Sequence, residues 1–353
     1  MKRVALVFGG PSAEHDVSVV SAKNIYSALK DSDLQILLLA ITKNKVWRRI
    51  TGEDLMQTSF QSPISVEEMG IKIELCKEGA HVFAKAIEGE EKSGPIDVVF
   101  PICHGPFGED GELQAELEEW GLSYVGSSQE SCQLSFDKAL TKQAIVFTGI
   151  PQAPYLAFEE KNPQFEEVKN QLGLPFFIKP ARMGSSVGIH KVKSKEEFHE
   201  ALADARIHDR KIIIEKAIVG RELECAILET DEGPKASGIG EVRPLHEFYS
   251  YEAKYLDPNG AELIIPAQVE PQIATHIQRL AVRAFQQLKC RDFARVDFFL
   301  ANDGAIYFNE LNTHPGFTNI SQFPLLWQQE GLGYKELILA LLNQADKRAY
   351  SNL

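Results

Sequence analysis

The sequence predicts an α/β fold that begins with a doubly wound parallel sheet and continues into α+β domains. Near the start, buried apolar runs at Val4–Phe8 and Leu34–Ile41 flank a segment with helical spacing, Val17–Leu29. This is the βαβ pattern of a parallel sheet. Near the end, two β-rich runs, Phe293–Leu300 and Ala305–Leu311, flank an Asp-Gly turn and predict an antiparallel hairpin.

The composition is that of a soluble globular protein. The chain has 353 residues, 44% of them hydrophobic and 25% charged, and this length predicts two or three domains. A net charge of −13 argues against nucleic acid or an anionic membrane as a partner. Five cysteines without a C-x-x-C pair indicate a reducing compartment. No apolar run is long enough for a signal sequence or a membrane span, so we expect a cytoplasmic protein.

Two loops of the first domain are candidates for ligand binding. Gly9-Gly10 ends the first strand, and because ligands lie beyond the carboxyl ends of such strands, Glu14 is expected near a pocket. The alternative for Glu14 is a solvated acid stabilised by the helix dipole. A second strand, Ile96–Cys103, leads into a loop that starts at His104 and contains three glycines and a proline. This composition at the end of a strand predicts a ligand loop, although a single histidine such as His104 is more often a structural hydrogen-bonding residue.

The rest of the chain alternates between helical and strand patterns. A Gly/Ser loop, Gly184–Gly188, follows an apolar strand and Lys179, and its backbone N–H groups could surround a phosphate. The long region Gly240–Pro266 has no clear structure but carries aromatic residues, which favours a lid over disorder. Other strands are predicted at His81–Ala86, Ser123–Val125, Phe176–Ile178, Lys211–Ala217 and Leu223–Leu228, and helices at Glu112–Trp120, Ser131–Phe147, Gln272–Leu288 and Leu325–Ala345.

The C-terminal hairpin carries the clearest chemical signal. With Asp303-Gly304 as a two-residue loop, Asp297 faces Glu310 and Arg295 faces Asn312, all on one side of the hairpin. Two opposed carboxylates repel each other, and a hard dication such as Mg²⁺ removes that repulsion. The alternative is a pair of solvated acids in an ion-pair network with Arg295. A three-residue loop would break the pairing on which this prediction rests.

Five motifs in order along nearly the whole chain resemble the ATP-grasp superfamily and, within it, the D-alanine–D-alanine ligase family. They are Gly9-Gly10-x-Ser12-Ala13-Glu14, His104-Gly105 with Gly108–Gly111, Lys179-Pro180 with Gly184–Gly188, Tyr251–Tyr255, and Asn309–Thr313 with Pro315–Thr318. The resemblance implies an N-terminal domain (residues 1–130), a central domain (131–220) and a C-terminal domain (221–353) with a lid at about 240–266. The last two domains would hold ATP between them. It also implies a homodimer.

The activity implied by the resemblance is the ATP-dependent joining of two D-alanine molecules through an acyl phosphate, for peptidoglycan precursor synthesis. Asp297, Glu310 and Asn312 would hold two Mg²⁺ (or Mn²⁺). The ATP-binding residues would be Lys138, Lys179 and Lys254 at the phosphates, Ser186 in the Gly/Ser loop, Glu215, Lys216 and Ile218 at adenine, and Glu222 at the ribose.

The resemblance also assigns the amino-acid site. Glu14 would bind the ammonium of the first D-alanine and join Ser185 and Tyr255 in a hydrogen-bonded set. His104 would lie near the reacting end of that substrate. Arg295 and the backbone N–H of Gly316 would form an oxyanion hole, and Ser321 would receive the second carboxylate. His314 and Gln322 depart from the residues usual at these positions, so selectivity for the second substrate stays open.

Three alternatives stay open. The second substrate could be D-lactate or D-serine, although Tyr255 favours D-alanine. The chain could be another carboxylate–amine ligase of the superfamily, against which Glu14, Ser185 and Tyr255 together argue. A non-catalytic nucleotide-binding regulator would lose metal ligands or phosphate-binding lysines, and none is lost here.

Overall fold

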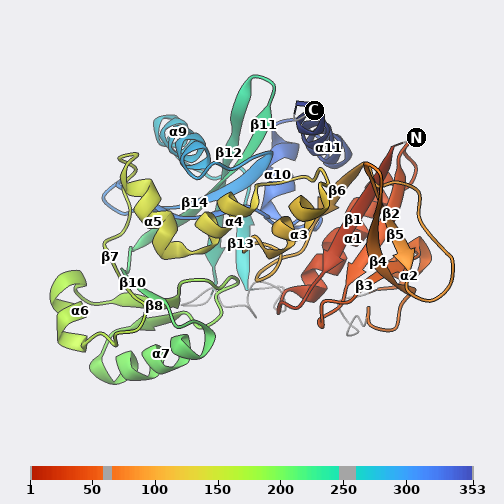
Figure 1. Ribbon diagram of the computed structural model, residues 1–353. Coiled ribbons are helices and arrows are strands. Elements are labelled where there is room, and N and C mark those ends of the chain that lie inside the picture. Colours follow the sequence, from red (N-terminus) through yellow and green to blue (C-terminus); the bar gives the residue numbers. More distant parts are fainter. Residues whose placement is uncertain (1, 59–65, 246–259, 352–353) are drawn as a thin grey trace.

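The computed structural model describes residues 2–58, 66–245 and 260–351, which form three sheets in succession along the chain (Figure 1). The first sheet has the strand order β5-β4-β3-β2-β1-β6. Its strands are β1 (Arg3–Gly9), β2 (Gln35–Ile41), β3 (Trp47–Ile50), β4 (Ile71–Glu78), β5 (His81–Ala86) and β6 (Val98–Pro101).

The first sheet is parallel on the side formed by β2, β1 and β6, and antiparallel on the other side. β1 is parallel to both β2 and β6, which confirms the predicted βαβ start. β3, β4 and β5 extend the sheet in antiparallel fashion. The link between β4 and β5 is too short for the helical crossover that parallel neighbours require. The sheet is therefore mixed rather than wholly parallel.

Helices from both ends of the chain cover the first sheet. α1 (His15–Leu29) follows β1, while α2 (Gly52–Gln57) and α3 (Glu112–Trp120) lie in the same region. The C-terminal helix α11 (Tyr334–Ser351) packs against α1 and β6. Its Leu341 belongs to the same buried cluster as Leu6 of β1. The two ends of the chain therefore share one hydrophobic core.

The second sheet is small and has a core of its own. Its order is β7-β10-β8-β9, formed by β7 (Tyr155–Phe158), β8 (Phe176–Pro180), β9 (His190–Val192) and β10 (Ile212–Lys216). All its pairs are antiparallel. α6 (Phe165–Leu172) and α7 (Lys195–His208) supply the apolar side chains that pack on it. In Figure 1 this unit lies at the opposite end of the molecule from the first sheet.

The third sheet lies between the other two and carries the predicted hairpin. Its order is β13-β12-β11-β14-β15, with β11 (Gly220–Thr230), β12 (Gly233–Pro244), β13 (Ala261–Ile264), β14 (Phe293–Ala301) and β15 (Ile306–Asn312). α9 (Pro271–Gln287) packs on one face, where Leu223 and Cys225 of β11 point. α10 (Gln322–Gln329) packs on the other face over Ala226 and Leu228. The alternation of side chains along β11 accounts for both layers.

The hairpin differs from the prediction in two places that compensate each other. The loop has three residues, because Ala301 N–H donates to the Ala305 carbonyl at 2.8 Å, and Gly304 has the positive φ (+85°) typical of such loops. Near the loop Phe298 pairs with Phe308, but further on Asp297 pairs with Glu310. Asn309 is thus a β-bulge, and it restores the predicted pairing of Asp297 with Glu310 and of Arg295 with Asn312.

Some predicted elements are wrong in their extent. The helix expected over Ser131–Phe147 is two helices, α4 (Gln129–Phe136) and α5 (Lys138–Val146), because Asp137 leaves the helical conformation and its side chain caps α5. Similarly, the predicted helix Leu325–Ala345 is interrupted between α10 and α11, where Gly331 has a positive φ of +85°. The predicted strand Ser123–Val125 forms only an isolated bridge, between Val99 and Tyr124.

The region predicted to be irregular, Gly240–Pro266, begins and ends with strands. β12 extends to Pro244 and β13 starts at Ala261. The predicted lid between these strands falls mainly on residues 246–259, which lie outside the described part of the chain.

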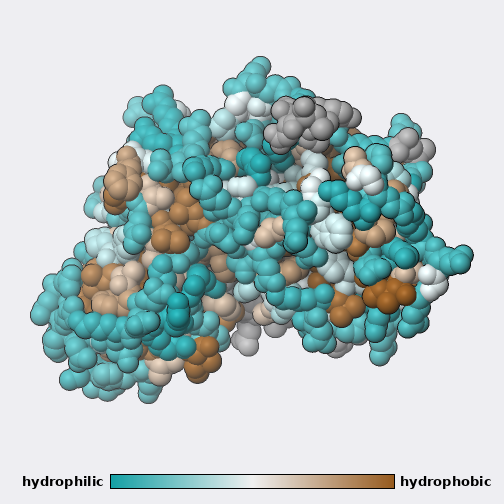
Figure 2. All heavy atoms as spheres, in the orientation of Figure 1, coloured by the Kyte–Doolittle hydropathy of each residue, from teal (hydrophilic) through white to brown (hydrophobic). Residues whose placement is uncertain are grey.

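In the described part of the chain no helix is both long and apolar enough to cross a bilayer. Figure 2 shows a mainly hydrophilic face with separate hydrophobic patches. Large exposed apolar side chains such as Phe147, Ile207 and Val219 lie far apart in the sequence, and scattered exposure of this kind is ordinary for a globular protein.

A buried ion pair ties α11 to the rest of the fold. The Asp292 carboxylate is fully buried and accepts hydrogen bonds from Arg348 Nη2 at 2.8 Å and Gly126 N–H at 2.7 Å. We expect Arg348→Ala to lower the free energy of unfolding by about 3 kcal/mol, because a buried carboxylate loses its counter-charge. Denaturant titration measures this. The exposed Arg279→Ala is the control, and equal stability of the two variants would contradict the assignment.

Candidate active site

Two joined cavities lie where the three sheets meet. A cavity of about 250 Å³ is lined from the first and third sheets, and one of about 570 Å³ is lined from the second and third. They share lining residues, among them Lys138, Arg295 and Glu310. The larger cavity is of the size usual for small-molecule sites, and the shared residues mark where its contents would meet those of the smaller one.

Every predicted site residue in the described part of the chain lines one of these cavities. The smaller one collects Glu14, His104, Asn312, Gly316 and Ser321. The larger one collects Lys179, Ser186, Glu215, Lys216, Ile218, Glu222 and Asp297. Lys138, Ser185, Arg295 and Glu310 line both. Lys254 and Tyr255 lie outside the described residues.

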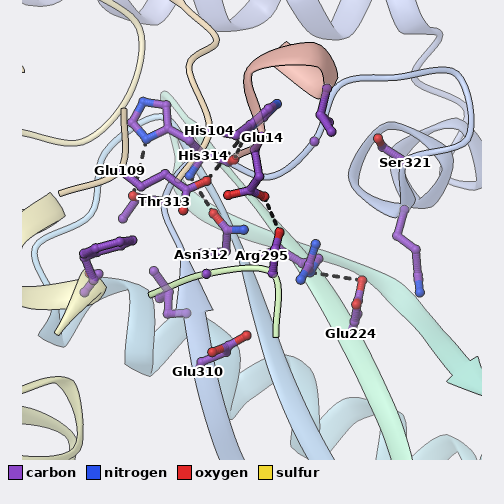
Figure 3. A pocket seen from close by; sticks show the side chains of 18 of the residues that line it. Glu14, His104, Glu109, Glu224, Arg295, Glu310, Asn312, Thr313, His314 and Ser321 are labelled. Atoms are coloured by element: carbon purple, nitrogen blue, oxygen red, sulfur yellow. Dashed lines mark hydrogen bonds and ion pairs between the residues drawn. The ribbon is translucent and has the colours of Figure 1, made fainter. Parts of the chain in front are cut away.

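Arg295 is the electrostatic centre of the site (Figure 3). Its Nε and Nη2 donate to the two oxygens of Asp297 at 2.8 Å each, and Nε lies 3.0 Å from Glu224 Oε2. Burial by itself lowers the pKa of Arg295, but Asp297 and Glu224 outweigh it and raise that pKa. The guanidinium is therefore a permanent cation held between strands β11 and β14.

The predicted metal ligands come together on adjacent strands. Asp297 and Glu310 are an opposed pair, and Asn312 is two residues further along β15. The Asn312 Oδ1 accepts the His314 N–H at 2.9 Å and keeps a second lone pair. In the described part of the chain, no three His, Cys, Asp or Glu side chains gather in a metal-binding cluster. Two carboxylates and an amide oxygen fit Mg²⁺, whose remaining ligands are typically substrate phosphates and water.

Lysines line the larger cavity around a buried glutamate. Glu215 lies 2.7 Å from both Lys142 Nζ and Lys179 Nζ. Lys138 Nζ donates to the Met183 carbonyl at 2.7 Å and lies 3.5 Å from Glu310 Oε2. Burial alone raises the pKa of Glu215, but the two ammonium groups outweigh it and lower the pKa to about 2. The carboxylate therefore holds two cations in fixed positions at the cavity wall.

The strand that carries Glu215 has no free edge. β10 lies between β7 and β8 and is hydrogen-bonded to both. Lys216 and Ala217 also donate their N–H groups to Pro154 and Pro175. The backbone groups of a central strand are hydrogen-bonded to its two neighbours. A ligand could therefore bond free backbone groups only beyond the end of β10, around Ile218, which lines the cavity.

A chain of hydrogen bonds joins the first domain to the Gly/Ser loop. The Ser185 hydroxyl donates to Glu14, whose own N–H donates to Ser12 Oγ at 3.0 Å. Ser185 and Ser186 both have positive φ values, +50° and +61°. Such conformations are costly for residues with a side chain.

Gly105 lets the loop after β6 come close to Glu14. Its φ is +71°, and a Cβ at this position would lie 2.5 Å from Glu14 Oε2, so glycine suits it.

His104 and His314 differ sharply in environment. His104 Nδ1 lies 3.2 Å from the His314 carbonyl and 3.7 Å from Glu109 Oε1. Burial by itself lowers the pKa of His104, but Glu109 and Glu14 outweigh it and raise that pKa. Burial lowers the pKa of His314 to about 3, so it is a neutral residue packed against Phe293. The unusual His314 thus lines the smaller cavity as a neutral, packed side chain.

Ser321 precedes α10 at the far side of the smaller cavity, apart from Glu14 in Figure 3. Its Oγ accepts the Thr318 N–H at 3.0 Å and lies 2.8 Å from Thr318 Oγ1. A Cβ on Gly316 would lie 2.7 Å from this oxygen, so the loop fits tightly around it. The hydroxyl and the first turn of α10 together form a small polar corner that favours an anion.

Three residues of the site escaped the sequence analysis. Glu224 pairs with Arg295, Lys142 pairs with Glu215, and Glu109 lies beside His104. Two of them follow from periodicity. Glu224 is two residues from Glu222 on one strand, and Lys142 is four residues from Lys138 on one helix, so each shares a face with a predicted residue. Glu109 lies in the predicted glycine-rich loop, where no periodicity relates it to a predicted site residue.

A mixed first sheet, two antiparallel sheets and a lysine- and carboxylate-lined cavity between them define an ATP-grasp ligase. Two family models match the chain, "D-ala D-ala ligase N-terminus" over residues 3–127 and "D-ala D-ala ligase C-terminus" over residues 145–343. The chain therefore belongs to the D-alanine–D-alanine ligase family.

Individual relatives agree with this. The chain is 43% identical to a D-alanine–D-alanine ligase of Oceanobacillus iheyensis, covering 98% of this chain and 96% of the relative. It is 41% identical to D-alanine–D-alanine ligase A of Escherichia coli, with the same coverage.

Among solved structures, the D-alanine–D-alanine ligase of Coxiella burnetii matches with a TM-score of 0.87 and 30% identity, over 99% of this chain and 95% of that one. The VanG D-Ala:D-Ser ligase of Enterococcus faecalis matches with 0.84 and 30%, over 98% and 99%.

The ionised Glu215 makes stability depend on pH in a defined window. Because its pKa falls from 4.5 to about 2 on folding, its contribution is complete above about pH 4.5 and is lost as the pH falls towards 2. We expect Glu215→Gln to be less stable than the wild type by about 3 kcal/mol at pH 7, with the difference shrinking below pH 4.5.

Denaturant titrations at pH 7, 4.5 and 3 measure the difference. Glu160→Gln, at an exposed position, is the matched control and should show no such trend. A gap between Glu215→Gln and wild type that stays constant down to pH 3 would contradict the ion-pair assignment.

Proposed function

We propose that this chain joins two D-alanine molecules to D-alanyl-D-alanine, with conversion of ATP to ADP and phosphate, for peptidoglycan precursor synthesis. Membership of the family supports the class of reaction. The observation that carries the assignment is the junction of the cavities at Lys138, Arg295 and Glu310. A nucleotide in the larger cavity would direct its terminal phosphate towards an amino acid in the smaller one.

In this proposal the second and third sheets bind ATP. Lys138 and Lys179, with Lys254 outside the described residues, contact phosphate oxygens as point charges. Ser186 and its neighbours in the Gly/Ser loop cover the phosphates. The chain around Glu215, Lys216 and Ile218 meets adenine, and Glu222 takes the ribose hydroxyls. Their position along the larger cavity supports these roles.

Asp297, Glu310 and Asn312 would hold two Mg²⁺ or Mn²⁺, as their donor chemistry allows. Bound there, the ions would neutralise the charge that develops on the phosphates. The chain itself contributes Arg295, which orients Asp297 by a two-pronged hydrogen bond.

The amino acids would occupy the smaller cavity. Glu14, held by Ser185, receives the ammonium of the first D-alanine, and His104 lies near its carboxylate. The carboxylate oxygen attacks the γ-phosphorus, the bond to ADP breaks, and an acyl phosphate forms. The amine of the second D-alanine, whose carboxylate lies at Ser321, attacks the acyl carbon. The amine gives up a proton and phosphate leaves with the bonding electrons.

Arg295 and the Gly316 N–H would stabilise the negative oxygen that forms when the amine attacks. One donor of this kind is typically worth about 3 kcal/mol of transition-state stabilisation. The lid with Tyr255, which lies outside the described residues, would exclude water from the acyl phosphate.

D-Serine or D-lactate as the second substrate is the alternative within the family. The VanG enzyme is a D-Ala:D-Ser ligase, and it resembles this chain about as closely as the Coxiella enzyme does. The residues proposed to bind the first substrate and ATP would be the same for each second substrate. The choice among D-alanine, D-serine and D-lactate therefore depends on the region around Ser321.

We further propose a cytoplasmic homodimer. All five cysteines are unpaired and four are buried, which suits a reducing compartment. Sedimentation of the purified chain would test the dimer, and a concentration-independent monomer would exclude it.

Release of phosphate from ATP tests the activity itself. We expect release to require D-alanine and to accompany formation of the dipeptide in a one-to-one ratio. D-Lactate in place of D-alanine should not support it. Release that needs no amino acid would contradict the proposed ligase.

Glu310→Gln tests the catalytic junction. We expect kcat to fall by at least about 100-fold, because a carboxylate facing the phosphates and Mg²⁺ is lost, with an unchanged circular dichroism spectrum. Asp303→Asn on the exposed tip of the same hairpin is the charge-matched control. Full activity of Glu310→Gln with an unchanged Mg²⁺ requirement would refute the metal assignment.

A further inference from the structure

The link between α7 and β10, Asp209–Lys211, holds two segments of the active site without entering it. None of its three residues lines either cavity. One part of the link contacts the residues that lead into the Gly/Ser loop, and another contacts the start of α5, which carries Lys138. Residues placed in this way can act on a ligand only through the segments that they hold.

On the loop side, Asp209 and the backbone of Lys211 fix the residues before the Gly/Ser loop. The buried Asp209 carboxylate accepts hydrogen bonds from Arg182 N–H at 2.9 Å and from Arg182 Nε at 3.0 Å. Ala181 N–H donates to the Lys211 carbonyl at 2.8 Å. The start of the loop is therefore held by contacts that do not involve the ammonium group of Lys211.

On the helix side, that ammonium group holds the N-terminal cap of α5. Lys211 Nζ donates to Asp137 Oδ2 at 2.8 Å, while Asp137 Oδ1 accepts two backbone N–H groups from the first turn of α5. The next residue, Lys138, donates its N–H to the Ala181 carbonyl at 3.0 Å. Its Nζ extends to the junction of the cavities and donates to the Met183 carbonyl at 2.7 Å. The position of the Lys138 ammonium therefore depends on the cap that Lys211 holds.

The charge of Lys211 matters because Asp137 is buried. Only 5% of Asp137 is exposed, and loss of one partner of a buried ion pair leaves an uncompensated charge, which is strongly unfavourable. The carboxylate can relieve this cost by turning towards water, and the cap of α5 then weakens. Because Lys138 directly follows Asp137, its backbone moves with the cap. The shift would reach Lys138 Nζ, which lies 3.5 Å from Glu310 Oε2.

We propose that Lys211 is a positioning residue for ATP: through the Asp137 cap, its ammonium holds Lys138 where it can contact the phosphates. This rests on the proposed function and adds to it a residue outside both cavities on which ATP affinity depends. The alternative is a purely structural role, in which Lys211 only strengthens the attachment of α5 to the second sheet.

The first test compares Lys211→Met, which keeps the length of the side chain, with Lys211→Arg, which keeps the charge. Calorimetry with ATP and Mg²⁺ measures Kd, and initial rates give KM for D-alanine. In Lys211→Met the Kd for ATP should rise about tenfold, because Lys138 loses part of its charge-assisted hydrogen bonding. KM for D-alanine should stay within about twofold, and Lys211→Arg should restore most of the ATP affinity. Lys161→Met, at an exposed position of the same domain, is the control and should bind ATP like the wild type.

A double-mutant cycle then shows whether Lys211 acts through Lys138. In a Lys138→Met background, the further change Lys211→Met should alter the Kd for ATP by less than about twofold, because the group that Lys211 positions is already gone. If Lys211→Met does not fold, Asp137→Asn replaces it in the same cycle, since it keeps an acceptor oxygen for the cap and removes the charge that Lys211 binds.

An ATP affinity unchanged in Lys211→Met, or an equal loss with and without Lys138, would overturn the proposal. A lower melting temperature with unchanged Kd would show the purely structural role. Failure of the proposed function appears in other measurements: the wild type would form no dipeptide, or Lys138→Met would bind ATP as tightly as the wild type.

Discussion

The site depends on one guanidinium placed among carboxylates. Arg295 holds Asp297 and Glu224 from two strands, and Glu310 lies opposite Asp297 on a third. Without a cation between them these acids would repel one another across the sheet and work against its pairing. The adjoining cavity follows the same rule, since Lys142 and Lys179 balance the buried Glu215 there. In both places the sheet can hold buried carboxylates only because cations lie beside them.

The sequence predicts the fold best where periodicity is strong. The βαβ start, α3, β5 and α9 follow from spacing alone and agree with the structure to within a residue or two. The sequence analysis did not predict the points where one residue changes the course of the chain. Asp137 ends one helix and caps the next. The bulge at Asn309 offsets the extra loop residue, so the pairing of Asp297 with Glu310 is kept. The sequence Asn-Asp-Gly is compatible with either a two-residue or a three-residue loop. Only the pairing of the two flanking strands decides which loop forms.

The candidate site was predicted in part from the residues and in part from resemblance. The hairpin acids follow from the alternation of strand side chains, whereas the adenine and oxyanion roles came from the family alone. What the sequence could not give is the partner of each charge. Periodicity places Glu224 and Lys142 on the right faces, but only the structure shows that each pairs with a predicted site residue, at 3.0 Å and 2.7 Å.

The packing of α11 on the first sheet bears on how fast the chain can fold. Leu337 and Leu341 of this helix share one core with Leu6 of β1 and Ile25 of α1. That core is complete only when segments from distant parts of the chain have met. Contacts between residues so far apart in the sequence slow the search for the native topology.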